Sequence, residues 1–236
     1  MQTELLFLSD AYQTDMVAEV IGVDGDKVAL DRTVFYATGG GQPCDLGRLV
    51  WDGGASSVVD VRKAGPTVWH TLDGDAPEVG QQVTGKIDWQ RRHQLMRTHT
   101  ALHILCGVIW NRWGTAVTGG NMEPLSARMD FEFDPLPEGF AREVEQLVND
   151  EIAADRPIEV SFLDRSDALS DADLIRTKVN LIPEAVTTIR VVDIVGLDKQ
   201  ADGGTHVAST GEVGRFEVVK TESKGKGNKR LRIRLS

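Results

Sequence analysis

Short stretches of alternating apolar and polar residues in the first part of the chain predict β-strands. They cover residues 17–23, 27–30, 47–51 and 82–87. Asp24-Gly25-Asp26 and Asp52-Gly53-Gly54 interrupt the pattern and are typical of turns. Short strands at this spacing favour a small barrel or a folded sheet. We therefore predict an N-terminal β-barrel-like domain over residues 1–87.

The period of the apolar pattern changes at residue 88, where we predict that a second domain, residues 88–236, begins. Apolar residues at helical spacing predict a helix over residues 89–113, with Asp88 as its N-cap and Gly114 as its stop. A second apolar stripe of helical period follows Pro137. Further predicted elements are a short polar helix over residues 166–178 and strands over residues 126–133, 157–163, 188–195, 212–222 and 229–235. Strands and helices mixed without strict alternation indicate an α+β fold.

Two histidines stand four residues apart in the predicted helix. Residues i and i+4 share one face of a helix, so the imidazoles of His99 and His103 can reach the same point. Asp202 and His206 have the same spacing, but the two glycines between them predict a loop. Three histidines and a carboxylate form a set of ligands suited to zinc. The helix lacks the glutamate of an H-E-x-x-H metalloprotease, so the general base of that family is absent.

A glycine run stands among the predicted strands, in Thr38-Gly39-Gly40-Gly41-Gln42. Three consecutive glycines cost backbone entropy and pack nothing, so they are poor strand residues. The run is either a flexible turn or a loop whose bare backbone approaches a ligand. In the second case Thr38 and Gln42 would supply directed hydrogen bonds. The stretch is not a phosphate-binding loop, because no Lys-Ser or Lys-Thr follows it.

Basic residues gather on the helix and in the predicted C-terminal hairpin. In Leu231-Arg232-Ile233-Arg234-Leu235 the arginines alternate with apolar residues and so share one face of a strand. Such a strand is either a charged edge that blocks aggregation or a contact for a phosphate backbone. The residues that are candidates for such a contact are Arg91, Arg92, Arg97, Lys224, Lys226, Lys229, Arg230, Arg232 and Arg234.

The net charge of −10 over 236 residues argues against broad, sequence-blind coating of nucleic acid, although a local basic patch is compatible with it. The two cysteines, Cys44 and Cys106, form no disulfide framework and indicate a reducing compartment. Neither a signal peptide nor an uncharged run of about 20 residues is present, so we expect a cytoplasmic protein and no membrane partner.

Taken together, four stretches resemble the AlaX family of free-standing alanyl-tRNA editing proteins, relatives of the editing domain of alanyl-tRNA synthetase. They are Phe35–Gln42, Arg97–His103, Gly203–Val207 and Glu222–Gly227. Each stretch alone is weak evidence for the family, but their order and separation together make the match strong. The resemblance covers nearly the whole chain. The glycine-rich stretch is similar to the medium-length class, in which a barrel-like domain precedes an α+β editing domain with a metal-bearing helix.

The resemblance implies a metal-dependent aminoacyl-tRNA hydrolase that removes serine, and in some members glycine, from tRNA(Ala). The synthetase makes these products because a pocket for alanine must admit glycine and rejects serine poorly. It further implies one Zn²⁺ ion on His99, His103, Asp202 and His206, and substrate contacts from Thr38–Gln42. The ion either makes a bound water the nucleophile or anchors and orients the substrate. No side chain is assigned as general base. We expect a monomer whose partner is mischarged tRNA(Ala).

One position departs from the family, which usually has Cys where this chain has Asp202. A carboxylate keeps the formal charge of a thiolate but is a harder ligand. Asp202 either binds the metal directly or holds a histidine or a water from outside. Two other functions stay open on the residues alone: a metal-dependent ester or amide hydrolase that ignores tRNA, and a non-catalytic RNA-binding module with a degenerate metal site.

Overall fold

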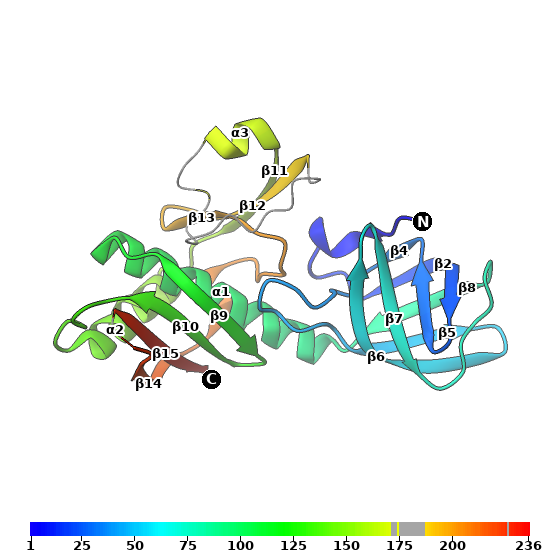
Figure 1. Ribbon diagram of the computed structural model, residues 1–236, viewed down its shortest axis with the longest axis horizontal. Coiled ribbons are helices and arrows are strands. Elements are labelled where there is room, and N and C mark those ends of the chain that lie inside the picture. The colour runs from blue at the N-terminus through cyan, green and yellow to red at the C-terminus, as the bar shows by residue number, and fades with distance from the viewer. Residues whose placement is uncertain (171–173, 175–186, 226) are drawn as a thin grey trace. The chain divides into compact units, whose positions relative to one another are not determined.

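A computed structural model of the chain describes residues 1–170, 174, 187–225 and 227–236. The chain divides into two compact units, Met1–Gln94 and Leu95–Ser236. Each unit is mainly β-structure, and the second also carries most of helix α1 (Trp89–Trp113), together with α2 (Phe140–Ala153) and α3 (Arg165–Ser170). The predicted α+β fold with a small N-terminal barrel is therefore confirmed (Figure 1). Within the described residues, no helix is long and apolar enough to cross a membrane.

The first unit is a closed barrel of six strands in the order β2-β3-β7-β6-β5-β8. Their bounds are β2 Asp15–Asp24, β3 Lys27–Leu30, β5 Gly47–Trp51, β6 Gly54–Ala64, β7 Thr67–Asp73 and β8 Gln82–Ile87. β1 (Glu4–Leu5) and β4 (Arg32–Thr33) pair in parallel beside the 3-10 helix Leu6–Leu8. All four strands predicted from alternation are present. β6 and β7 were not predicted.

The barrel interior follows from the alternation, because every second residue of β8 is buried, as is every second residue of β2 from Met16 to Gly22. Phe35 fills the interior and is fully buried. Gly85 leaves room for it, since a Cβ there would lie 3.1 Å from the Phe35 ring and 2.7 Å from Met16 Cε. His70 is also fully buried and bonds Thr33 Oγ1 at 2.8 Å.

Helix α1 (Trp89–Trp113) starts and ends where the sequence predicts. The Asp88 carboxylate accepts a hydrogen bond from the Arg91 backbone N–H at 3.1 Å, which confirms the N-cap. Gly114 ends the helix with φ +66°, a conformation that favours glycine. Trp89, in the first turn, packs against the barrel core. The first compact unit runs to Gln94, so it includes the first residues of the helix.

The second unit contains a four-stranded antiparallel sheet in the order β14-β15-β10-β9. Its strands are β9 Val117–Glu123, β10 Ser126–Glu132, β14 Phe216–Ser223 and β15 Asn228–Leu235. Helix α2 (Phe140–Ala153) buries Phe140, Val144, Val148 and Ile152, the predicted apolar stripe, and contacts β14. A 3-10 helix, Thr210–Val213, precedes β14.

A second antiparallel sheet of the same unit has the order β11-β12-β13. Its strands are β11 Ile158–Asp164, β12 Thr188–Ile194 and β13 Asp198–Ala201. The short strand β13 was not predicted, and it delivers the chain directly to Asp202. The helix predicted over residues 166–178 is present as α3 (Arg165–Ser170), and its remainder falls largely outside the described residues.

Candidate metal centre

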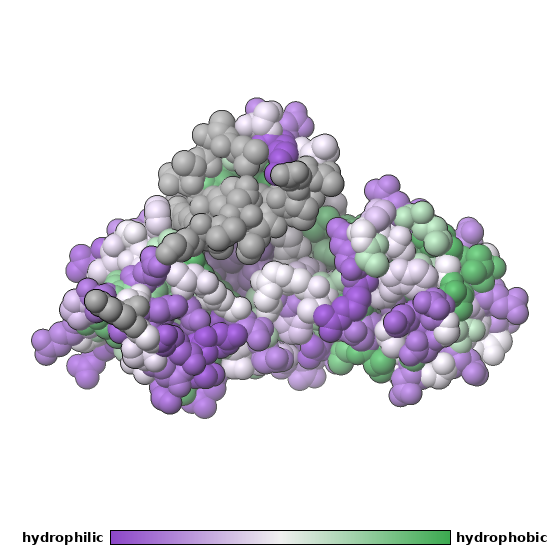
Figure 2. Space-filling view, viewed as in Figure 1, coloured by the Kyte–Doolittle hydropathy of each residue, from purple (hydrophilic) through white to green (hydrophobic). Residues whose placement is uncertain are grey.

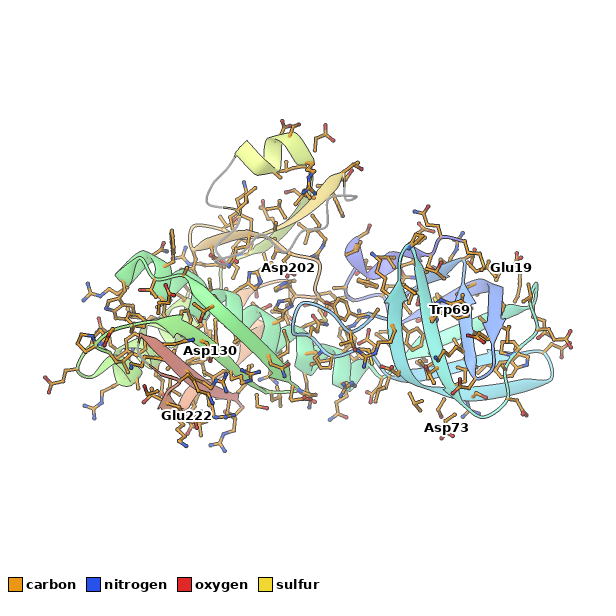
Figure 3. The ribbon with its side chains drawn as sticks, in the orientation of Figure 1. Glu19, Trp69, Asp73, Asp130, Asp202 and Glu222 are labelled. Carbon is orange, nitrogen blue, oxygen red and sulfur yellow. The ribbon has the colours of Figure 1, made fainter. Side chains whose placement is uncertain are left out.

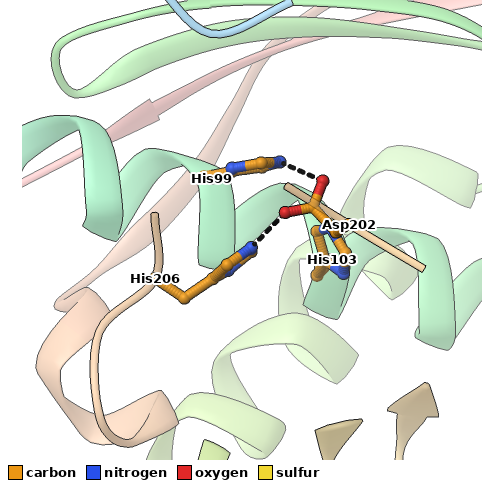
Figure 4. A group of neighbouring side chains, drawn as sticks. All are labelled: His99, His103, Asp202 and His206. Atoms are coloured by element: carbon orange, nitrogen blue, oxygen red, sulfur yellow. Dashed lines mark hydrogen bonds and ion pairs between the residues drawn. The ribbon is translucent and has the colours of Figure 1, made fainter. Parts of the chain in front are cut away.

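His99, His103, Asp202 and His206 converge in the second unit, as their spacing predicts (Figure 4). Each offers one ligand atom, and these atoms all lie within 4.8 Å of one another. The three imidazole rings lie with their centroids 4.3 to 5.1 Å apart. The histidines are buried and the carboxylate is partly exposed. The group has the composition and compactness to hold one metal ion.

The loop that carries Asp202 and His206 leaves β13 and has no regular structure, as its glycines predict. Its shape is set by Arg190 of β12, whose buried guanidinium donates to the Asp202 and Gly204 carbonyl oxygens at 3.0 and 2.9 Å. The Gly204 N–H donates to Asp202 Oδ2 at 2.6 Å. These bonds turn the Asp202 carboxylate toward α1, and Figure 3 shows it there beside the helix.

Asp202 contacts the histidines through the ring atoms that a metal would use. Its Oδ1 lies 3.6 Å from His99 Nε2, and its Oδ2 lies 3.1 Å from His206 Nε2. Two ligand atoms at the usual zinc distance in a tetrahedral site are about 3.4 Å apart. A carboxylate that oriented the histidines without binding the metal would contact the ring nitrogen that faces away from the metal, Nδ1, instead. The geometry therefore fits Asp202 as a member of the ligand set.

The protonation states also suit a divalent cation. Burial lowers the pKa of His99 to about 4, and burial together with neighbouring His99 lowers the pKa of His206 well below its ordinary value. Burial alone would raise the pKa of Asp202, but the surrounding imidazoles, His99 foremost, hold it well below its usual value. Neutral imidazoles and an ionised carboxylate are the forms that bind metal, so His99, His206 and Asp202 are ready to bind, whereas a metal would have to displace a proton from His103, whose pKa is raised.

Two residues that sequence reasoning missed engage the far nitrogens of the histidines. Thr100 Oγ1 lies 3.1 Å from His206 Nδ1 and accepts a bond from the Val207 N–H. Asp198 Oδ2 lies 3.4 Å from His103 Nδ1. Burial opposes protonation of His103, but the carboxylates of Asp198 and Asp202 outweigh it and raise its pKa. In both rings the outer contact leaves Nε2 for a metal.

The stretch Thr38–Gln42 lies in the first unit and forms a tight turn. Gly39 and Gln42 exchange backbone hydrogen bonds of 3.1 and 2.9 Å, and Gly40 and Gly41 between them have φ of +57° and +85°. These are the angles of a type I′ turn, which explains two of the glycines. Thr38 Oγ1 accepts a bond from the Cys44 N–H at 3.1 Å and its hydroxyl also bonds the Cys44 thiol, so the Thr38 side chain supports the loop.

Arg92 was predicted to contact tRNA, and its burial in the structure contradicts that prediction. Its guanidinium is fully buried and donates to the Asp45 carboxylate and to the carbonyl oxygens of Ala11 and Val34. A side chain enclosed in this way has no access to a nucleic acid. Arg97 is half-buried and donates to the carbonyls of Val213 and Ser236, which also indicates a structural role.

On β15, the predicted alternation is present, with Leu231, Ile233 and Leu235 buried and Arg232 and Arg234 exposed. Figure 2 shows hydrophilic surface over this part of the sheet. Carboxylates accompany the arginines: Arg232 pairs with Glu222 at 3.1 Å, and Arg234 pairs with Glu217 at 2.8 Å.

The other basic residues of the hairpin differ in exposure. Arg230 binds Asp130 through two bonds of 2.7 Å, and its side chain is only 13% exposed. Lys224 is exposed and Lys229 half-exposed, whereas Lys226 lies outside the described residues. The surface open to a phosphate backbone is therefore smaller than the sequence predicts.

Two family models match the chain. Residues 2–91 match the model of tRNA synthetases class II (A). Residues 189–232 match the second additional domain of threonyl and alanyl tRNA synthetases. The second match contains Asp202 and His206, half of the candidate metal centre.

Curated relatives extend the similarity over the whole chain. An alanyl-tRNA editing protein AlaX-M of Methanosarcina barkeri is 36% identical, with 97% of each chain aligned. The AlaX-M protein of Saccharolobus solfataricus is also 36% identical, again over 97% of each chain. An alanine–tRNA ligase of Pyrobaculum aerophilum is 39% identical over 94% of this chain, which corresponds to 25% of the ligase.

Proposed function

This chain belongs to the family of alanyl-tRNA editing proteins AlaX-M, and on that premise we propose that it deacylates Ser-tRNA(Ala) in trans. Gly-tRNA(Ala) is a second substrate of the same site. The observation that carries the proposal is the convergence of three histidines and Asp202 in a chain that aligns with editing proteins over 97% of both lengths. The protein acts as a monomer in the cytoplasm, where aminoacyl-tRNA is made and used.

His99, His103, Asp202 and His206 would hold one Zn²⁺ ion. Such an ion supplies Lewis-acid chemistry, which polarises an ester carbonyl or makes water acidic near neutral pH. The chain's part is to fix the ligands. The Gly204 N–H holds the Asp202 carboxylate, Arg190 holds the loop through the carbonyl oxygens of Asp202 and Gly204, and Thr100 orients the His206 ring.

Selection between serine and alanine requires a polar group, because the two amino acids differ by one hydroxyl. A site that hydrogen-bonds a hydroxyl rejects the analogue lacking it by roughly 10⁴–10⁵, since its own polar group would otherwise be buried without a partner. We assign this role to Thr38, with Gln42 and the glycine backbone of its turn as further substrate contacts. The support for the assignment is the half-buried hydroxyl that Thr38 carries beside the glycine turn.

The acceptor stem of the tRNA is bound through cations of the helix and the hairpin. Lys224, Arg232 and Arg234 are exposed, Arg91 and Lys229 are partly exposed, and Lys226 lies outside the described residues and stays a candidate. Arg232 and Arg234 are 46% and 61% exposed, and each carboxylate pair leaves other N–H donors of the guanidinium for phosphate. Phosphate contacts of this kind make binding strongly dependent on salt.

The test is a comparison of four substrates: Ser-, Gly- and Ala-tRNA(Ala), and a free seryl ester without tRNA. We expect Ser-tRNA(Ala) to be hydrolysed fastest, Ala-tRNA(Ala) to be spared, and the rate on tRNA to fall steeply with ionic strength. Equal rates on the free ester would favour a hydrolase that ignores tRNA. Binding without any hydrolysis would favour a non-catalytic RNA-binding module.

A further inference from the structure

The turn between β12 and β13 packs on one stripe of α1. His103, Gly107 and Asn111 are each four residues apart, so they lie along one face of the helix. The Asn111 side-chain amide donates to the Leu197 carbonyl oxygen at 3.1 Å. Leu197 is itself in a tight turn, because its N–H donates to the Ile194 carbonyl at 2.9 Å. One end of the stripe thus anchors the turn, and the other end carries a proposed metal ligand.

Gly107 provides the space for this packing. A Cβ at Gly107 would lie 2.9 Å from Asp198 Cβ and 3.2 Å from both Leu197 Cγ and the Leu197 carbonyl oxygen. The first distance is closer than carbon atoms approach without displacement. Glycine within a helix costs about 1 kcal/mol relative to alanine, so its presence here needs a reason. The reason is that any side chain would push Asp198 away from the helix.

Asp198 uses that space to reach His103. Its side chain is fully buried, and Oδ2 lies 3.4 Å from His103 Nδ1. Gln200 Nε2 donates to the same oxygen at 2.6 Å, which fixes the carboxylate from the other side. A carboxylate is costly to bury unless it serves a charged or hydrogen-bonding partner. The partner that the turn brings to it is the imidazole of His103.

We propose that Asp198 is a positioning residue for the metal centre. Its carboxylate lies at ion-pair distance from His103 Nδ1, which is buried and makes no hydrogen bond within the described residues, and it accepts the Nδ1–H when Nε2 binds the ion. Because Gly107 has no side chain, Asp198 can lie close enough to the helix to reach His103. The inference rests on the metal centre of the proposed function, and Asp198 itself touches neither substrate nor ion. A carboxylate behind a ligating histidine fixes the ring and makes it a stronger donor, and its loss typically costs 10–100-fold in metal affinity.

The test measures Zn²⁺ affinity by competition with a chromophoric chelator, on protein first freed of metal. Asp198→Asn keeps the shape and removes the charge, so we expect 10–100-fold weaker binding and a shifted visible absorption spectrum of the Co²⁺-substituted protein. A residue that only filled space would change neither. Asp193→Asn is the matched control, because Asp193 stands on β12 opposite Lys199 of β13, in the same hairpin, and should bind zinc as the wild type does.

Gly107→Ala is the second variant and tests the same contact from the helix side. We expect it to weaken zinc binding at least tenfold, and we expect the double variant with Asp198→Asn to be no weaker than Asp198→Asn alone, because both act through one contact. Wild-type affinity in Asp198→Asn, or full additivity in the double variant, overturns the inference. Failure of the wild type to bind zinc overturns the proposed metal centre itself.

Discussion

Asp202 Oδ2 lies 3.1 Å from His206 Nε2, although the two residues are joined by a loop and not by a helical turn (Figure 4). In a loop, a spacing of four residues does not by itself bring two side chains together. Here the approach depends on the Gly204 N–H, which binds the same carboxylate oxygen, and on Arg190, which ties down the loop carbonyls. The contact is therefore built by the tertiary structure.

The first prediction concerns Asp202. Asp202→Cys restores the ligand usual in the family and should retain both zinc and deacylation activity. Asp202→Ala removes a ligand, so zinc affinity should fall by more than the 10–100-fold that is lost when a residue behind a ligating histidine is removed. Metal content and chelator competition measure this. Full zinc binding and full activity in Asp202→Ala would place this carboxylate outside the ligand set.

The second prediction concerns Arg190. Arg190→Gln leaves the carbonyl oxygens of Asp202 and Gly204 without their donor. Each unsatisfied buried group costs about 1–3 kcal/mol, so we expect a lower melting temperature and weaker zinc binding together. Lys199→Gln, on the exposed side of β13, is the control and should change neither. If zinc affinity stayed at the wild-type value, the loop would not need this anchor.

Sequence reasoning located the four candidate ligands but not the residues that orient them. His99 and His103 follow from helical spacing, and α1 itself was predictable from Asp88, Gly114 and the apolar period. Asp198 was hidden because its strand, β13, is only four residues long, which is too short for a pattern. Thr100 stands where an H-E-x-x-H helix has its glutamate, and nothing in the sequence indicates that it contacts His206.

Charged residues gave the clearest error. Arg92 was predicted to contact tRNA, which assumed an exposed side chain, because charged side chains on a helix usually face solvent. It is buried because Asp45 and two carbonyl groups enclose it, and Asp45 stands 47 residues earlier, beyond the reach of any local pattern. Arg190 is different, because it stands among apolar residues in β12, and a cation in that position of the sequence indicates burial.

The third prediction concerns pH and the barrel. Burial lowers the pKa of His70 to about 4, whereas an unfolded histidine titrates near 6.5. Below pH 6.5 the unfolded chain therefore takes up a proton that the folded barrel refuses, and stability is lost as pH falls toward 4. Between pH 7.5 and 5 this histidine should cost about 2 kcal/mol.

The measurement is chemical denaturation at several pH values for the wild type and for His70→Gln, which cannot titrate. The variant removes the bond to Thr33 and is expected to be less stable at every pH. Its stability should nevertheless fall less steeply below pH 6.5. Parallel curves for the two proteins would show that His70 is protonated in the folded barrel.

The fourth prediction concerns the basic strand. Replacing Arg232 and Arg234 by Gln should weaken tRNA binding across sequences and reduce the slope of its salt dependence by about 1 for each phosphate that is no longer bound. The fold should persist, because both side chains are exposed. Replacing Lys27 and Lys86, exposed cations of the barrel, is the control. An unchanged slope would show that the two arginines do not contact phosphate and that β15 is only a charged edge strand.

The fifth prediction concerns Thr38. Thr38→Val should slow Ser-tRNA(Ala) hydrolysis and narrow the gap to Ala-tRNA(Ala), whereas Thr38→Ser keeps the hydroxyl and should preserve the gap. The Val variant also loses the bond from the Cys44 N–H, so the barrel should be destabilised by about 1–3 kcal/mol. Deacylation rates on both substrates, below the melting temperature, measure the ratio. The same ratio in the Val variant would exclude Thr38 as the discriminator.

The central claim is that this chain hydrolyses Ser-tRNA(Ala) through a metal held by three histidines and Asp202. The most direct measurement is single-turnover deacylation by metal-free protein to which zinc is added in steps. We predict that metal-free protein is inactive and that the rate rises with added zinc and saturates at one ion per chain. Full hydrolysis by protein whose metal content is verified as zero would contradict the account.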